Sequence, residues 1–167
     1  MLDLACGDGG LGGALIALGL RYRGVDSTPE MVEAARERLG EHAVVEPGDL
    51  NDYVPPSPVA ATTVFRAIYY TRDRRAFFGC VHDYTEKKLV FDLNPRQYRL
   101  REVRADLRAA GFDRLALRPF FAPQRLAPPA PLRALLHVAE RSGPLARAAL
   151  RFRFSYLCAA YRGSSAA

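Results

Sequence analysis

The residues that point most directly to chemistry lie in the first 26 positions of the chain. The segment LDLACGDGGLGG, residues 2–13, combines glycines with two acidic side chains, and Asp26 follows the next apolar segment. Glycines lack Cβ, so their main chain can approach a ligand closely and can adopt positive φ. A helix that begins after such a turn offers free N–H groups to the same ligand. The segment therefore predicts a small-molecule site at a strand-to-helix turn.

The spacing of the glycines leaves two classes of nucleotide to consider. Gly7, Gly9 and Gly12 match G-x-G-x-x-G, which with an acid further along the chain is typical of dinucleotide sites. Asp3 lies inside the first strand, however, where a dinucleotide site usually has apolar residues, and Asp8 in the turn would repel a pyrophosphate. A cationic ligand tolerates both acids. S-adenosylmethionine, which carries a sulfonium and an ammonium group but no phosphate, is such a ligand.

At these residues the chain resembles the class I S-adenosylmethionine-dependent methyltransferases. The family pattern acid-x-Gly-x-Gly-x-Gly is matched from Asp3 to Gly9, with Ala5 in place of the first glycine. The resemblance implies that Asp26, in GVDSTPEMVEAAR, bonds both ribose hydroxyls of the cofactor. A carboxylate suits that role because it accepts hydrogen bonds from two adjacent hydroxyls at once.

The resemblance assigns further roles along the chain. Met31 corresponds to an apolar residue near the adenine, Asp49 to an acid that bonds the adenine amino group, and the segment VFRAIYYT to the strand that enters the active site. The cofactor residues it implies are Asp3, Ala5, Cys6, Gly7, Gly9, Asp26, Ser27, Met31, Asp49, Leu50 and Arg66, and the acceptor residues are Tyr69 and Tyr70. A structural alternative stays open for several of them. Asp26 can simply cap a helix, Met31 can belong to the core, Asp49 can be a turn residue, and the tyrosines can pack on the sheet.

The hydrophobic pattern predicts an α/β fold that can position these residues. We expect strands at residues 1–5, 21–25, 43–46, 59–68, 87–93, 112–121 and 150–161, and helices at 11–18, 29–39, 73–84, 96–110 and 132–141, with Gly143-Pro144 as an interruption. In the second helix, Met31, Ala34, Ala35 and Leu39 are expected on one face. The alternation predicts a Rossmann-like, doubly wound sheet with helices on both faces, and the resemblance adds an antiparallel last strand.

The same reading gives the expected domain organisation. Residues 1–162 are predicted to form a single methyltransferase-like domain, and residues 163–167 a disordered tail. Methyltransferases of this class usually have helices before the first strand, and these are expected to be missing here because Met1 already lies in the strand. Without them the cofactor site would be more open to water.

The amino-acid composition limits the cellular location and the binding partners that we expect. The 167 residues carry a net charge of +6, with 10 basic and 14 acidic side chains in residues 1–95 and 14 basic and 4 acidic ones in residues 96–167. The basic residues are dispersed singly, without a basic-aromatic module, which argues against nucleic acid as a partner. No apolar run approaches the roughly 20 residues of a membrane span. Three separated cysteines indicate neither disulfides nor a metal site and favour a reducing, cytoplasmic location.

Taken together, these features predict methyl transfer from S-adenosylmethionine to a small-molecule acceptor. The alternatives are a truncated or degenerate methyltransferase fold without activity, and an NAD-dependent oxidoreductase, which would need a substrate domain or catalytic pair that the sequence lacks. No catalytic residue is assigned, although Tyr69, Tyr70 and Asp92 are candidate bases by position, and the oligomeric state is not predicted. The acceptor pocket is expected at the loops after the fourth and fifth strands and at Pro119–Pro131. Its dispersed Arg118, Arg125 and Arg133 suit an apolar acceptor with a negative group.

Overall fold

The computed structural model describes residues 1–120, 129–149 and 155–163 of the chain, and it confirms the predicted α/β fold. Seven strands form one sheet in the order β3-β2-β1-β4-β5-β7-β6. In chain order the strands and helices are β1 (Leu2–Leu4), α1 (Gly10–Ala17), β2 (Tyr22–Asp26), α2 (Pro29–Leu39), β3 (Ala43–Pro47), β4 (Val59–Val64), α3 (Arg74–Tyr84), β5 (Thr85–Leu93), α4 (Leu100–Ala109), β6 (Phe112–Phe120), α5 (Ala130–Arg141), α6 (Gly143–Ala149) and β7 (Ser155–Arg162). Short 3-10 turns, η1 (Gly40–His42) and η2 (Ile68–Tyr70), follow α2 and β4.

The direction of the strands defines the edge of the sheet at which a ligand can bind. Strands β1 to β5 pair in parallel, and β7 runs antiparallel to both β5 and β6, as the resemblance implied. From β1 the chain moves outward through β2 to β3, and then returns to β4 on the other side of β1. The strand order therefore reverses between β1 and β4, and open α/β sheets bind ligands at the carboxyl ends of the strands at such a reversal.

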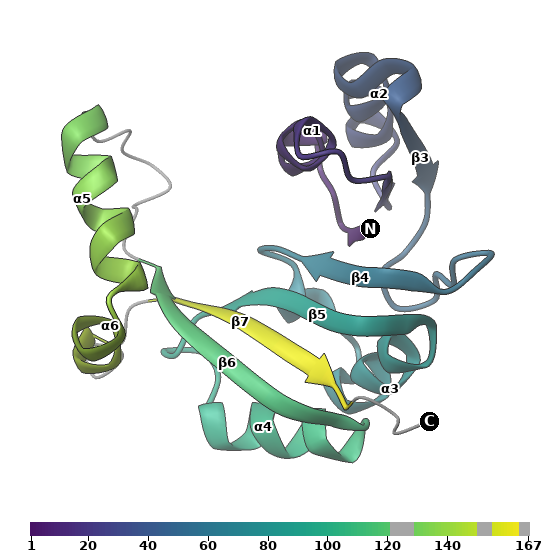
Figure 1. Ribbon diagram of the computed structural model, residues 1–167. Coiled ribbons are helices and arrows are strands. Elements are labelled where there is room, and N and C mark those ends of the chain that lie inside the picture. The colour runs from purple at the N-terminus through teal and green to yellow at the C-terminus, as the bar shows by residue number, and fades with distance from the viewer. Residues whose placement is uncertain (121–128, 150–154, 164–167) are drawn as a thin grey trace.

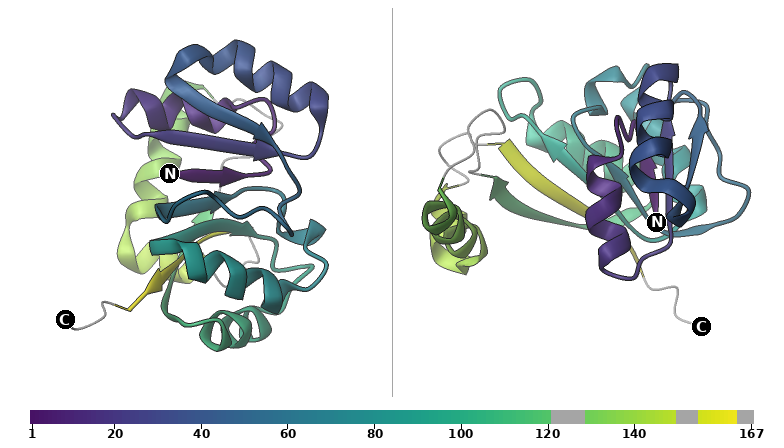
Figure 2. Two further views of the ribbon diagram at one scale, coloured as in Figure 1. Left: turned by 90° about the vertical axis from the view of Figure 1, so that its right-hand side faces the viewer. Right: turned by 90° about the horizontal axis from the view of Figure 1, so that it is seen from above.

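Two hydrophobic cores hold the helices on opposite faces of the sheet. The smaller core joins Val32, Ala35 and Leu39 of α2 to Tyr22 and Val45 of the sheet. The larger one packs α3 and α4 against β1, β4, β5 and β7, with Phe78, Phe91 and Leu89 fully buried. Figure 1 shows α1 and α2 at the β3 end of the sheet and α3 and α4 at the β6 end. Figure 2 shows the same separation in two further views.

Helix α2 has the predicted bounds, but its buried face differs from the predicted one. Val32, Ala35 and Leu39 are buried, whereas the Met31 side chain is 41% exposed. Spacings of three and four residues place Val32, Ala35 and Leu39 in one stripe, and Met31 lies beside that stripe. The expectation that Met31 shares the packed face was therefore wrong, and this leaves its side chain available to the cleft described below.

Other differences from the predicted elements have local causes. The predicted strand 59–68 ends at Val64, because Arg66 adopts a φ of +56° and residues 68–70 form η2. The predicted helix 96–110 begins only at Leu100, because Gln97 and Tyr98 donate their N–H groups to Asn94 in a turn. The predicted interruption at Gly143-Pro144 is present, because α5 ends at Arg141, but the sequence did not predict α6, which begins at Gly143 with Pro144 in its first turn. Most of the predicted tail, residues 164–167, and residues 150–154 of the predicted last strand lie outside the described part.

On the side away from α3 and α4, the half of the sheet face formed by β5, β7 and β6 is covered by no described helix, and we call it the half-face. On β5 and β7 the buried residues alternate with half-buried ones, which include Val90, Asp92, Leu157 and Ala159. Figure 1 looks onto this half-face of β5, β7 and β6, and no described helix lies over it. The α5–α6 segment between β6 and β7 stands beside the carboxyl end of β6 (Figures 1 and 2). None of the helices in the described part has the length and apolarity that a bilayer crossing requires.

Candidate cofactor site

A cleft of about 1070 Å³ lies where the strand order reverses. Its walls come from the segments that follow β1, β2, β3 and β4. Of the cofactor residues predicted from the sequence, all but Gly9 line this cleft: Asp3, Ala5, Cys6, Gly7, Asp26, Ser27, Met31, Asp49, Leu50 and Arg66. The predicted acceptor residues Tyr69 and Tyr70 line it as well. The topology thus brings into one cleft residues that are up to 67 positions apart in sequence, from Asp3 to Tyr70.

The turn after β1 presents bare main chain to the cleft. Ala5, Gly7 and Gly9 all have positive φ, of +55°, +55° and +74°. A Cβ on Gly7 would meet nothing within 4 Å, so this glycine leaves open space on the cleft side. Gly9 has a different role, because a Cβ there would lie 2.9 Å from the Leu39 side chain. Gly9 is buried between α1 and α2, which explains why it does not line the cleft.

Asp26 ends β2 and joins two turns of the cleft. Its Oδ2 accepts the N–H of Gly7 at 2.8 Å, and its Oδ1 accepts the N–H of Thr28 at 2.9 Å. The side chain therefore orders both the glycine turn and the backbone just before α2, where Thr28 makes no side-chain cap of its own. Thr28 precedes the first helical residue, Pro29, so this bond orders the approach to α2 and does not cap its first turn. A carboxylate has about four acceptor positions, so Asp26 retains capacity for ligand hydroxyls.

Asp3 lies below the turn, in the central strand β1, and is buried. Its two oxygens accept the hydroxyl of Tyr22 at 2.8 Å and the hydroxyl of Thr63 at 2.6 Å. Burial raises the pKa of the Asp3 carboxyl, and the two hydroxyl donors oppose that rise. Asp3 thus forms the floor of the cleft and links β1 to both neighbouring strands.

Cys6 also lines the cleft, next to Asp3 and Asp26. Burial, followed in size by the nearby Asp3 and Asp26 carboxylates, raises the pKa of its thiol to about 12. The thiolate is the nucleophilic form of cysteine, so Cys6 is inert as a nucleophile near neutral pH. Cys6 instead packs closely against β2, because a Cβ on Gly24 would lie 2.9 Å from its sulfur.

One wall of the cleft is a hydrogen-bonded bridge between the segments after β3 and β4. Asn51 donates its side-chain amide to Asp49 at 2.8 Å and to the Tyr70 carbonyl at 3.3 Å, and it accepts the N–H of Arg72 at 2.9 Å. Arg72 in turn pairs with Asp49 at 2.9 Å. The hydrogen bond from the Asn51 main chain is the largest cause that holds the pKa of Asp49 below its ordinary value. Asp49 is therefore an ionised acceptor already fixed in orientation.

The segment after β4 also brings Arg66 and the tyrosine pair to the cleft. Asp92, at the end of β5, accepts the main-chain N–H of Arg66 at 2.6 Å and so supports its left-handed backbone conformation. The rings of Tyr69 and Tyr70 lie 4.4 Å apart and are largely exposed. Burial is the largest cause that raises the pKa of Tyr69, so its phenol keeps its proton near neutral pH. These side chains provide an aromatic surface beside a guanidinium group.

Asp8, the second acid of the glycine turn, is balanced by a partner that sequence spacing does not reveal. Its carboxylate pairs with Arg38 of α2 at 2.7 Å and accepts the N–H of Gly10 at 3.2 Å. In the described part of the chain, no group of three or more His, Cys, Asp or Glu side chains could hold a metal ion.

Comparison with known proteins shows the family to which the chain belongs. The profile of the methyltransferase domain matches residues 1–88, which is more than half of the chain and includes every predicted cofactor residue together with Tyr69 and Tyr70. The chain belongs to the methyltransferase domain family. The cofactor of this family is S-adenosylmethionine, as the resemblance implied.

Relatives and solved structures agree with this family. An uncharacterized methyltransferase of Schizosaccharomyces pombe is 49% identical over 49 residues, which is 29% of this chain but only 18% of that protein. A candidate methyltransferase of Haloferax volcanii, solved with the Trm112 methyltransferase activator, shares the fold with a TM-score of 0.72 and 21% identity, over 99% of this chain and 82% of that one. Magnesium protoporphyrin IX methyltransferase of Synechocystis, with bound S-adenosylmethionine, gives a TM-score of 0.68 and 17% identity, over 97% of this chain and 69% of that one.

The cleft of this methyltransferase domain also contains residues that the sequence analysis missed. Asn51 and Arg72 close one wall, Arg38 balances Asp8, and Thr28, Gly48 and Phe65 also line the cleft. Asn51 and Arg72 are 21 positions apart on loops of non-adjacent strands, so no local pattern links them. The one available signal was the general rule that loops after parallel strands gather at the same edge.

Proposed function

We propose that this chain transfers a methyl group from S-adenosylmethionine to a small-molecule acceptor. The observation that supports it best is the position of Asp26. Its carboxylate ends β2 and accepts the main-chain N–H of Gly7, in a cleft at the reversal of strand order. A dihydroxylated ribose fits a carboxylate of this kind, and the glycine turn leaves room for the rest of the nucleoside.

The residues that would hold the cofactor fit its chemistry. Asp26 would accept the ribose hydroxyls, while Met31 and Leu50 offer apolar contacts to a flat base. Asp49, fixed by Asn51 and Arg72, would accept from an amino group of that base. Arg66, in the segment after β4, would pair with the carboxylate of the methionine moiety. When bound, the cofactor supplies a methyl group already activated by the positive charge on sulfur.

The protein's own contribution to the reaction would be proximity and orientation. Holding two reactants in line can lower a barrier by roughly 7–11 kcal/mol. Tyr69 and Tyr70 offer an exposed aromatic surface on which an acceptor can lie. With its raised pKa, Tyr69 would donate a hydrogen bond to the acceptor instead of removing its proton. If a proton must be removed, Asp92 is the carboxylate that lies beside the segment after β4, through its bond to Arg66.

Isothermal titration of the chain with S-adenosylhomocysteine and, separately, with NAD tests the cofactor assignment. We expect S-adenosylhomocysteine to bind with one site per chain, and NAD to bind at least 100-fold more weakly. Preferential binding of NAD would refute the proposal. A folded chain that binds neither nucleotide would instead indicate a methyltransferase fold that has lost its cofactor.

A further inference from the structure

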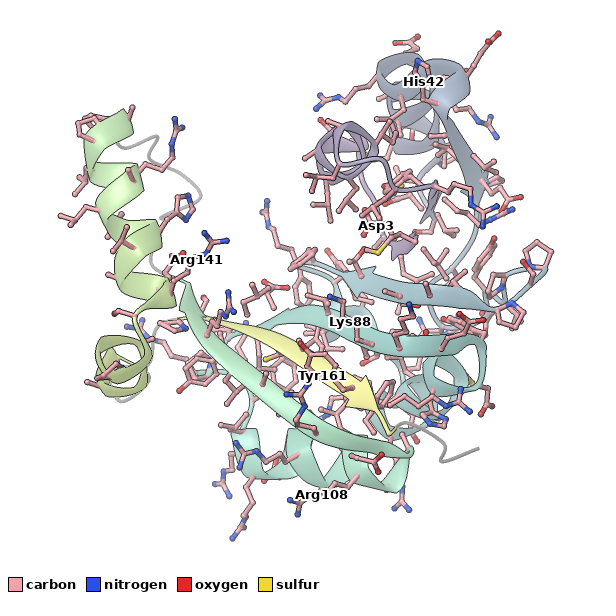
Figure 3. All side chains as sticks on the ribbon, in the orientation of Figure 1. Asp3, His42, Lys88, Arg108, Arg141 and Tyr161 are labelled. Atoms are coloured by element: carbon pink, nitrogen blue, oxygen red, sulfur yellow. The ribbon has the colours of Figure 1, made fainter. Side chains whose placement is uncertain are left out.

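A second cavity, of about 430 Å³, lies at the same edge of the sheet as the cofactor cleft. It is formed by Arg118, Pro119, His137, Glu140, Arg141 and Leu157. Strand β6 is antiparallel to β7, which is itself antiparallel to β5, so β6 ends at the same edge as β4 and β5. Figure 3 shows Arg141 at the foot of α5, close to the end of β6.

The charges of this cavity favour an anion. Arg118 and Arg141 bring two guanidinium groups to it, and within the described residues neither forms an ion pair with an acidic side chain. Glu140, the one acid among the described residues of the lining, lies 3.2 Å from His137 and is largely buried. Guanidinium groups bind carboxylate and phosphate oxygens with two parallel hydrogen bonds. Buried Pro119 and half-buried Leu157 add an apolar floor beside them.

A row of side chains leads from this cavity to the cofactor cleft. In the sheet, Arg118 lies opposite Leu157, and Leu157 lies opposite Asp92 of β5. Val64 pairs with Phe91, so the next residue, Phe65, lies beside Asp92 and lines the cofactor cleft. Directly paired residues point to the same face of a sheet, and this is the half-face without a described helix (Figure 1). Neighbouring strands are about 4.8 Å apart, so the three steps from β4 to β6 span roughly 14 Å.

We propose that this cavity binds the anionic head group of the methyl acceptor, and that the acceptor is an elongated, mostly apolar acid that lies along the row from Arg118 to Phe65. The inference rests on the proposed function, because the methyl group is delivered at the cofactor cleft. Carboxylate and phosphate head groups share the required chemistry. The span between the head group and the reacting atom is roughly the separation of β6 from β4, which excludes very short acids as acceptors.

Binding of simple probes tests this site without knowledge of the natural acceptor. The probes are octanoate, octyl phosphate and, as the neutral counterpart, 1-octanol, titrated into the full chain at 0.15 M salt. We expect the two anions to bind more tightly than 1-octanol. The Arg118→Gln/Arg141→Gln double variant should weaken anion binding at least tenfold, and each single variant about threefold, without a change for 1-octanol. The comparison of the two anions identifies the preferred head group.

Arg133→Gln is the matched control, because Arg133 is an exposed arginine of α5 that does not line the cavity. It should change anion binding less than twofold. Anion affinity that is equal in the wild type and the double variant would overturn the inference, as would equal affinity for octanoate and 1-octanol. S-adenosylhomocysteine is titrated into the same proteins. If S-adenosylhomocysteine binds but the anions do not, only the proposed anion site is refuted. If S-adenosylhomocysteine does not bind, the proposed function is refuted.

Discussion

Asp26 orders two turns of the protein and is proposed to bind the ribose of the cofactor. A substitution affects both roles, and separate measurements of affinity and stability distinguish them. Asp26→Ala removes the acceptor for Gly7, for Thr28 and for the ribose hydroxyls. Loss of charged hydrogen bonds of this kind costs about 1.5–3 kcal/mol, so we expect S-adenosylhomocysteine affinity to fall by roughly 10- to 150-fold. Isothermal titration measures the change, and chemical denaturation measures the accompanying loss of stability.

Asp83→Ala is the control for that experiment, because Asp83 is an exposed acid on α3, far from the cleft lining. It should leave the affinity unchanged. Asp26→Asn retains one oxygen acceptor and no charge, so its affinity should lie between those of the wild type and Asp26→Ala. If Asp26→Ala binds S-adenosylhomocysteine as tightly as the wild type, Asp26 does not contact the ligand.

Ala5 occupies a position that the family usually gives to glycine, and its backbone shows the consequence. With a φ of +55° it lies in the left-handed region, which costs an L-residue about 1–2 kcal/mol. Ala5→Gly removes this strain but adds freedom to the unfolded chain, which costs about 0.4–1 kcal/mol. We expect a net gain of about 0.5–1 kcal/mol in the free energy of unfolding, measured with urea.

The same substitution in a helix provides the contrast. Ala105→Gly lies at an exposed position within α4 and should destabilise the chain by about 1 kcal/mol. Opposite signs for Ala5→Gly and Ala105→Gly would show that the effect depends on the local backbone. A loss of stability for both would contradict the strained conformation of Ala5.

At the scale of elements, α1 depends on close packing against its neighbours. A Cβ on Gly12 would lie 2.8 Å from both the Leu39 side chain and the Tyr22 ring, whereas a Cβ on Gly13 would have no neighbour closer than 3.9 Å. Both substitutions to alanine gain helix propensity of about 1 kcal/mol. Overpacking of a core costs about 1–3 kcal/mol, so Gly12→Ala should be neutral or destabilising and Gly13→Ala stabilising by up to about 1 kcal/mol.

Urea denaturation of the two variants measures this difference directly. Because both glycines lie in the same helix, the contrast isolates contact with α2 and β2 from helix propensity. Equal stabilisation by the two alanines would mean that α1 does not pack closely on Leu39 and Tyr22.

Most helices and strands could be predicted because the residues that start and end them lie within or next to them in the sequence. Helix α2 has the predicted bounds, since Pro29 favours the start of a helix and Gly40 its end. The glycine turn and the acids after β1, β2 and β3 could be assigned to one site because parallel strands bring their carboxyl ends together. Gly143-Pro144 correctly marked the end of α5, but the same proline also suits the first turn of a helix, and α6 was not predicted.

The long-range contacts could not be predicted from the sequence. The pairing of Asp8 with Arg38 and the bridge from Asn51 to Arg72 join segments that come together only in the folded chain. The same holds for the cavity at Arg118 and Arg141, because it depends on how α5 stands against the ends of β6 and β7. Spacing along the sequence carries no information on such contacts until the strand order is known.

At the scale of the whole molecule, the interior strand β1 contributes apolar residues to the larger core on one face and a carboxyl group on the other. Leu2 and Leu4 face the larger core, while Asp3 points to the other face and bonds Tyr22 of β2 and Thr63 of β4. A carboxyl group thus occupies a buried position that an apolar residue would usually fill. Its protonation is therefore coupled to the stability of the entire sheet, because the pKa of Asp3 is raised chiefly by burial.

The sign of this coupling follows from the raised pKa. The folded state binds the Asp3 proton more tightly than the unfolded state, in which a free carboxyl titrates near pH 4. The stabilisation from the proton is complete below that pH and is lost as the pH rises through the raised folded-state pKa. Asp3→Asn cannot titrate. The free energy of unfolding of the wild type minus that of Asp3→Asn should therefore fall between pH 4 and the raised pKa and remain constant above it.

Urea denaturation of both proteins at pH steps from 4 to 8 measures this difference. The comparison is needed because Glu46 and Asp49, whose pKa values are lowered chiefly by hydrogen bonds from Tyr53 and Asn51, change the stability in the opposite direction. Those groups are present in both proteins, so their contributions cancel. A constant difference would mean that burial and the Tyr22 and Thr63 hydroxyls balance. A difference that grows with pH would mean that the hydroxyls stabilise the ionised carboxylate more than burial destabilises it. Asp3 would then be a charged anchor of the sheet, and the floor of the cleft would carry a full negative charge beneath the proposed cationic ligand.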